Sequence, residues 1–103
     1  MGNSSVETLW NRRDRLGIMA EIMEKSREGI LKTQILYGVN LSFSQLREYV
    51  SFLTEMGFLK VHIKKRKKIY KTTAKGVQYI ESYREMLNLL RKSEMVKASI
   101  LQM

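Results

Sequence analysis

Cysteine and proline are absent from this 103-residue chain, and histidine occurs once, as His62. Without cysteine there is no disulfide framework, thiolate zinc site or cysteine nucleophile, and one histidine cannot build a histidine metal cluster. No run of about 18 apolar residues is present, so the sequence predicts no membrane span. A glycine-rich phosphate loop is also missing. We therefore expect a protein that is not an enzyme, with no metal, no cofactor and no small-molecule ligand.

Acidic residues are few beside basic ones, 10 against 19, which leaves a net charge of +9. Most of this excess lies in one segment, residues 60–71, which holds seven basic residues and no acidic one. These residues are Lys60, Lys64, Lys65, Arg66, Lys67, Lys68 and Lys71. A solvated charge run is the simplest interpretation, but adjacent cations repel one another unless a polyanion neutralises them. The strand-like apolar residues on both sides favour contact with phosphates.

Apolar residues at helical spacing predict three helices in the first half of the chain. They are expected over about residues 5–27, 32–39 and 43–56. Ser42, with Gln45 three positions later, forms a capping box at the start of the third helix. The apolar stripe of this helix consists of Leu46, Val50 and Leu53. We expect this stripe to be buried in the core.

The second half predicts a β-hairpin followed by a long helix. Residues 58–63 alternate apolar with polar side chains from Leu59 onward, which predicts a half-buried strand, and residues 69–72 are predicted to form a second strand. The basic run 64–68 lies between them, and it lacks the Asn-Gly signal of a tight turn, so we expect a loose tip. Thr73 can cap the last helix, which could continue to about residue 101.

This last helix has more apolar surface than a small domain can cover. At 1.5 Å per residue, about 28 residues span roughly 42 Å. Four apolar side chains follow a 3-4-3 spacing, which is typical of a coiled coil. They are Ile80, Tyr83, Leu87 and Leu90. We therefore expect a homodimer held by this helix, with these four residues at the interface.

The element order of three helices, a hairpin and a fourth helix is that of a winged helix-turn-helix. The predicted fold class is mainly α with a small β-hairpin and a long C-terminal dimerisation helix. We expect an N-terminal arm over residues 1–13, a winged-helix DNA-binding domain over residues 14–73, and the dimerisation helix over residues 74–103. In this arrangement a helix fits the major groove of DNA, and a cationic hairpin reaches flanking phosphates or the minor groove.

Two segments resemble a known family. Residues 33–42, Thr-Gln-Ile-Leu-Tyr-Gly-Val-Asn-Leu-Ser, are similar to an archaeal winged-helix pattern in which threonine and tyrosine precede an Asn-Leu-Ser turn. Residues 70–76, Tyr-Lys-Thr-Thr-Ala-Lys-Gly, resemble the stretch that opens the last helix of that family. The chain thus resembles small archaeal chromatin proteins of the Sul10a type over about residues 14–95. The resemblance implies dimerisation through the C-terminal helices as an antiparallel coiled coil.

The candidate DNA-binding residues lie on three elements. On the third helix, Gln45 and Arg47 could reach base edges or phosphates, and Ser44 could donate to a phosphate; a plain solvated helix face is the alternative. Lys32 and Thr33, at the start of the second helix, could hold a backbone phosphate. The wing supplies Lys64, Lys65, Arg66, Lys67 and Lys68.

We expect the partner to be double-stranded DNA, bound in chromatin organisation or transcriptional regulation. Two alternatives stay open: a protein-interaction module and an RNA-binding protein. The basic run argues against the first, and only Tyr70 could stack a base from the wing, which argues against the second. The chain begins without the apolar stretch of a secretory signal, so the expected location is cytoplasmic, associated with the chromosome and not with a membrane.

Overall fold

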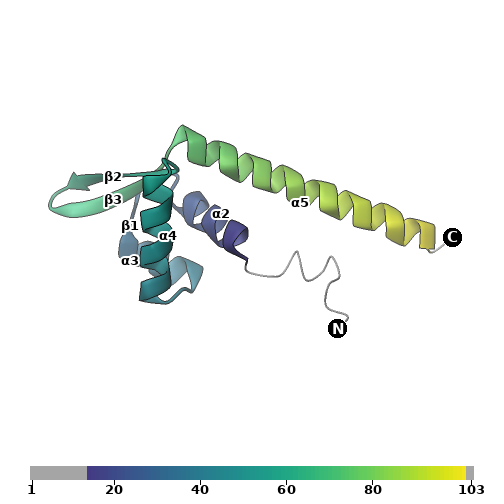
Figure 1. Cartoon of the computed structure of the whole chain (residues 1–103), viewed down its shortest axis with the longest axis horizontal. Helices are drawn as coiled ribbons and strands as arrows, with labels where there is room; N and C mark the ends of the chain where they lie inside the picture. The colour runs from purple at the N-terminus through teal and green to yellow at the C-terminus, as the bar shows by residue number, and fades with distance from the viewer. Residues whose placement is uncertain (1–13, 102–103) are drawn as a thin grey trace.

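The computed structural model describes the backbone of residues 14–101 and the side chains of residues 14–93. The elements are α2 (Arg15–Lys25), β1 (Ile30–Leu31), α3 (Lys32–Val39), α4 (Phe43–Glu55), β2 (Leu59–Lys64), β3 (Lys67–Thr72) and α5 (Ala74–Leu101). Helices α2, α3 and α4 gather left of the centre of Figure 1, while the β2–β3 hairpin and α5 project in opposite directions. The predicted fold class, a winged helix-turn-helix with a long C-terminal helix, is confirmed.

Helix α2 is shorter than the sequence predicted. Asp14 has extended backbone angles, and its carboxylate accepts a hydrogen bond from the Gly17 N–H at 2.8 Å, so it caps the helix before Arg15. Ser26 ends the helix after Lys25. A single continuous helix over residues 5–27 is therefore wrong, because the cap at Asp14 interrupts it. The part of that prediction before residue 14, with the N-terminal arm, lies outside the described residues.

Helices α3 and α4 begin with similar side-chain caps. Gln34 accepts a hydrogen bond from the Leu31 N–H at 3.0 Å at the start of α3. Asn40 ends α3 in the left-handed conformation, with φ of 54°. At α4, Ser42 accepts from the Gln45 N–H at 3.1 Å and Gln45 accepts from the Ser42 N–H at 3.0 Å. The predicted capping box is confirmed. Three residues, 40–42, connect the end of α3 to the start of α4.

The core joins all the helices to the base of the hairpin. The predicted stripe of α4 is buried: Leu46 and Leu53 are 0% exposed, and Val50 is 3% exposed. Other core residues are Ile18, Ile22, Met23, Ile35, Val39, Leu59, Tyr70 and Ile80. The apolar side chains of α4 thus fix one of its faces against the domain and leave the opposite face to solvent.

The strands form a three-stranded antiparallel sheet in the order β1-β3-β2. The β2–β3 hairpin was predicted, but β1 was not, because two residues are too few for an alternating pattern. β1 pairs Ile30 with Tyr70 across the sheet. The Thr72 hydroxyl donates to the buried carbonyl of Met23 at 2.5 Å, which fastens the end of β3 to α2.

The tip of the hairpin is a tight turn. Lys64 pairs with Lys67, which leaves only Lys65 and Arg66 between the strands. Both have positive φ, 50° and 65°, as a type I′ turn requires. The expectation of a loose tip is therefore wrong. The twist of the strands selects this turn although neither residue is glycine, and each left-handed residue costs about 1–2 kcal/mol.

Helix α5 begins as predicted, because Thr73 accepts a hydrogen bond from the Gly76 N–H at 3.1 Å. Gly76 lies so close to its neighbours that an added Cβ would sit 2.5 Å from the Phe58 carbonyl oxygen. Ile80, one turn further on, is 2% exposed and belongs to the core. Beyond this point α5 extends away from the domain (Figure 1). Within residues 14–101, no helix is sufficiently long and apolar to cross a membrane.

Candidate nucleic-acid interface

The wing, defined here as β2, β3 and the turn between them, has two different faces. Residues paired across the strands point to the same face of a sheet. Leu59 and Tyr70 lie on the inner face, and they are 2% and 7% exposed because they belong to the core. The opposite, outer face carries two pairs of lysines, Lys60 with Lys71 and Lys64 with Lys67. The sheet thus gathers four lysines on a surface that the core cannot cover.

All the predicted wing cations are accessible. Lys64, Lys65, Arg66, Lys67 and Lys68 are each exposed. Glu24 forms ion pairs with Arg27 and Arg84, and no described carboxylate forms an ion pair with a wing cation. The wing therefore keeps its whole positive charge for an external partner.

The solvent-exposed side of α4 carries a stripe of serine and glutamate side chains. Ser44, Glu48, Ser51 and Glu55 follow a 4-3-4 spacing, which places them on one side of the helix, and all four are exposed. The two carboxylates on this stripe would repel phosphates. Arg47 lies to one side of it and lines a groove between α4 and the wing. Ser51 and Glu55 of the stripe line the same groove further along α4, so the cationic part of the helix is the N-terminal portion of the side that borders the wing.

This groove has a volume of about 440 Å³. It brings together three predicted site residues from three elements: Lys32 of α3, Arg47 of α4 and Lys68 of β3. Glu55 also lines it, at the end away from the N-terminus of α4. A groove with cations on three walls matches the negative charge of a nucleic-acid backbone.

The other predicted residues of α3 and α4 lie outside the groove lining. Thr33, Ser44 and Gln45 are exposed. The side-chain oxygen of Gln45 is occupied by the capping box, and Gln45 lines a different hollow, between α4 and α2. The amide nitrogen of Gln45 is the part of its side chain left for a base or phosphate.

Sequence reasoning missed Phe43, the first residue of α4, which is 52% exposed. The Lys32 Nζ lies 5.7 Å from the centre of the Phe43 ring, and the Arg47 Cζ lies 5.8 Å from it. From the sequence alone, a phenylalanine next to a capping box is expected to be a core residue. Its spacing of four from Arg47 was the one available signal.

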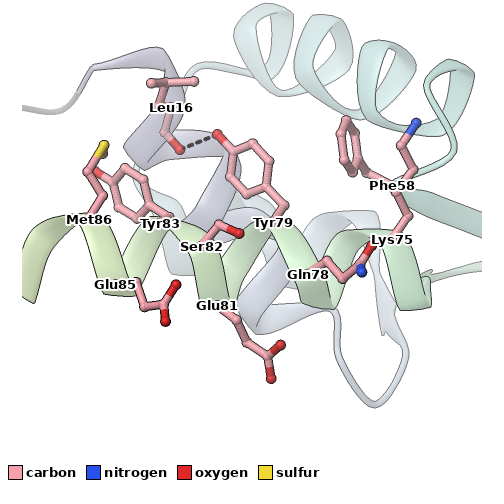
Figure 2. Close-up of a pocket in the computed structure, with 10 residues that line it drawn as sticks. All are labelled: Leu16, Phe58, Lys75, Gln78, Tyr79, Glu81, Ser82, Tyr83, Glu85 and Met86. Atoms are coloured by element: carbon pink, nitrogen blue, oxygen red, sulfur yellow. Dashed lines mark hydrogen bonds between the residues drawn. The ribbon is translucent and has the colours of Figure 1, made fainter.

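A second hollow, of about 870 Å³, runs along α5 (Figure 2). The Tyr79 hydroxyl donates to the Leu16 carbonyl at 2.8 Å, and its ring stacks on Tyr83 at 6.5 Å between centres. Burial raises the pKa of Tyr79 to about 12 and also raises the pKa of Tyr83. The Tyr79 hydrogen bond fixes α5 to α2.

The four predicted interface residues of α5 differ in their accessibility. Ile80 packs into the core of its own chain, so its side chain is not available to a second copy. Tyr83, Leu87 and Leu90 are half-buried. Two neighbours outside the predicted set expose more surface, Met86 at 42% and Leu89 at 65%. The accessible apolar surface of α5 thus begins after Ile80.

Three helices, a hairpin wing and a fourth, long helix define a winged-helix protein. The chain belongs to the winged helix-turn-helix family, whose sequence profile matches residues 12–100. The family resemblance inferred from residues 33–42 and 70–76 is confirmed.

Two relatives come from Methanocaldococcus jannaschii. The uncharacterized protein MJ0290 is 32% identical over 81 residues, which are 77% of this chain and 36% of MJ0290. The chain thus spans about a third of the length of that relative. The uncharacterized protein MJ0287 is 30% identical over 80 residues, 77% of this chain and 78% of MJ0287. The archaeal resemblance therefore holds in sequence as well as in fold.

Among solved structures, the chain is similar to Sso10a-2, a DNA-binding protein from Sulfolobus solfataricus. The TM-score is 0.74, at 21% identity, and the match covers 87% of this chain and 95% of Sso10a-2. At this identity the likeness shows the shared fold.

Proposed function

We propose that this chain binds double-stranded DNA as a homodimer, through the wing and the N-terminal part of α4. One observation carries the proposal: the wing holds seven basic residues, none of them paired with a described carboxylate. Phosphate neutralisation releases counterions from DNA, and this term supplies most of the affinity of non-specific binding. The basic residues of the wing can therefore contribute strongly to the affinity for duplex DNA.

Helix α4 contributes through one side rather than through its outermost stripe. Arg47 of α4 and Lys32 of α3 line the groove near the N-terminus of α4, whereas Glu48 lies outside the groove lining and Glu55 lines the far end of the groove. A duplex seated on the groove keeps its phosphates near the cations. The contact therefore includes the N-terminal end of α4, where helix–turn–helix proteins meet base edges.

The homodimer rests on the apolar surface of α5. Met86 and Leu89 are exposed, and Tyr83, Leu87 and Leu90 are half-buried beside them. Burying a large apolar side chain contributes about 1.5–3 kcal/mol. Pairing with a second copy would cover this surface and set two wings at a fixed distance. Linked sites raise the effective concentration of the second, which strengthens binding to a long duplex.

Binding to a short duplex tests the proposal. The wing variant Arg47→Ala, Lys68→Ala removes two cations that line the groove, one from α4 and one from the wing, and leaves the turn residues unchanged. The control Lys25→Ala, Lys92→Ala removes the same charge from exposed positions on α2 and α5. The wing variant should bind more weakly to every sequence, with a salt slope reduced by about 2, while the control keeps the wild-type slope.

Two results would contradict the proposal. Equal slopes for the two variants would show that net charge, and not the wing, determines binding. Stronger competition by duplex RNA than by duplex DNA of equal length would make the chain an RNA-binding protein.

The cellular role follows from how the protein occupies DNA. We propose chromatin organisation or transcriptional regulation, and Sso10a-2 is described as a DNA-binding protein, which supports the common part of both roles. A footprint on genomic fragments separates them. Uniform protection would indicate an architectural protein, and a short protected palindrome would indicate an operator-specific regulator.

A further inference from the structure

The start of α4 exposes an aromatic ring at the position where a winged helix meets bases. Phe43 is the first residue of α4 and is 52% exposed, although the apolar stripe of the same helix is almost fully buried. Half of a large apolar ring therefore remains in water in the free protein, next to the groove between α4 and the wing.

Two cations hold this ring from different elements. The Lys32 ammonium at the start of α3 lies 5.7 Å from the ring centre, and the Arg47 guanidinium, one turn along α4, lies 5.8 Å from it. Both distances are within the range of cation–π attraction, so the ring and the cations restrict one another's positions. The result is an apolar contact surface inside a cationic rim.

The chemistry of this surface limits its partner. An apolar group bordered by two cations fits a ligand that carries negative charge and a small apolar group close together. Duplex DNA has this combination in its major groove, where thymine presents a C5-methyl group between the phosphate backbones. No other base carries an apolar group on that edge.

We propose that Phe43 contacts the C5-methyl of thymine in the major groove, with Lys32 and Arg47 on the neighbouring phosphates. This inference rests on the proposed DNA binding and adds a preference for sites that contain A·T pairs at this position. The cations supply affinity that is independent of sequence, and the ring supplies the discrimination between thymine and the other bases.

The experiment compares a duplex with the same duplex in which deoxyuridine replaces every thymidine, since this change removes only the methyl groups. Binding is measured by fluorescence anisotropy for the wild type and for Phe43→Ala. Burial of one methyl contributes about 0.8 kcal/mol, so the wild type should bind the thymine duplex about fourfold more tightly per methyl contacted. The variant should bind both duplexes equally.

Phe52→Ala is the matched control. Phe52 lies on the same helix and is 46% exposed, but it lines the hollow between α4 and α2. This variant should keep the wild-type preference for thymine. Phe43→Leu keeps an apolar side chain and should retain part of the preference, which provides a second comparison if the alanine variant is poorly folded.

Three outcomes would overturn the inference. The wild type could bind both duplexes equally, or Phe43→Ala could keep the full preference, or Phe52→Ala could abolish it. In each case DNA binding itself would stand. A wild type that binds neither duplex would instead overturn the proposed function along with the inference.

Discussion

Leu53 is a single side chain on which the position of α4 depends. It is 0% exposed and belongs to a core that also contains Ile22 and Ile35. Leu53→Ala should lower the free energy of unfolding by about 2–5 kcal/mol, because it removes packed methyl groups and leaves a cavity. Chemical denaturation measures this loss. The control Ser51→Ala, at an exposed position on the same helix, should change stability by less than about 0.5 kcal/mol. A similarly small loss for Leu53→Ala would contradict the packing described.

Gly76 has no room for a side chain. A Cβ at this position would lie 2.5 Å from both the Phe58 carbonyl oxygen and the Thr72 Cγ2. Gly76→Ala should therefore destabilise the protein by about 1–3 kcal/mol, although alanine is the better helix former. In Gly38→Ala the new Cβ meets only the flexible side chain of Lys25, so that variant should be neutral or slightly stabilising. Thermal unfolding of the two variants compares them, and equal midpoints would contradict the account.

At the residue scale, local patterns could be predicted and long-range contacts could not. The capping box of Ser42 and Gln45 follows from residues three positions apart, and the buried stripe of α4 follows from helical spacing. The contact of Gly76 with Phe58 joins residues that lie 18 positions apart in the sequence. The contact of the Phe43 ring with Lys32 joins α4 to α3. Neither contact leaves a periodic trace in the sequence.

Among the elements, the wing has a turn whose backbone conformation lowers the stability of the protein and cations that are proposed to bind DNA phosphates. Lys65 and Arg66 both have positive φ, which asparagine and glycine adopt more easily. Lys65→Asn, Arg66→Gly should therefore raise the free energy of unfolding by about 1 kcal/mol or more. The same variant removes two cations and should reduce the salt slope of DNA binding by about 2.

Thermal unfolding and salt titration of this one variant measure both effects. A lower unfolding midpoint would contradict the turn conformation. An unchanged salt slope would mean that the tip does not contact phosphates.

Elements whose apolar residues repeat at helical or strand spacing were predicted closely. Elements that form only because another strand pairs with them were not. α3 over residues 32–39 matches the expectation because Ile35, Leu36 and Val39 repeat at helical spacing. β1 has only two residues and exists because β3 pairs with it. The tight turn arises from the twist of its strands. The sequence of the turn, Lys-Arg, does not indicate it.

In the whole molecule, α5 runs along the longest axis (Figure 1). The molecule measures 62 × 28 × 19 Å, and α5 runs away from the domain (Figure 1). Its first turns belong to the core through Ile80, but Met86 and Leu89 lie beyond that support. The domain positions one end of the helix, and a second copy is proposed to cover the rest.

Sedimentation equilibrium tests this pairing. The wild type should have twice the chain mass of 12.1 kDa at tens of micromolar. Leu87→Glu, Leu90→Glu should shift the mass to that of one chain, because charged side chains would have to be buried between the helices. The control Asn88→Glu, Lys92→Glu, at exposed positions, should remain dimeric. A wild type with the mass of a single chain would contradict the dimer.

Neutralisation of DNA phosphates by the wing predicts a strong salt dependence of wild-type binding. The measurement is the dissociation constant for one mixed-sequence duplex across a series of salt concentrations. Five phosphate contacts per chain predict a slope of about −4 to −5 for the logarithm of affinity against the logarithm of salt concentration, and up to twice that for a dimer. A slope near zero would contradict the account, because binding would then not depend on the wing cations.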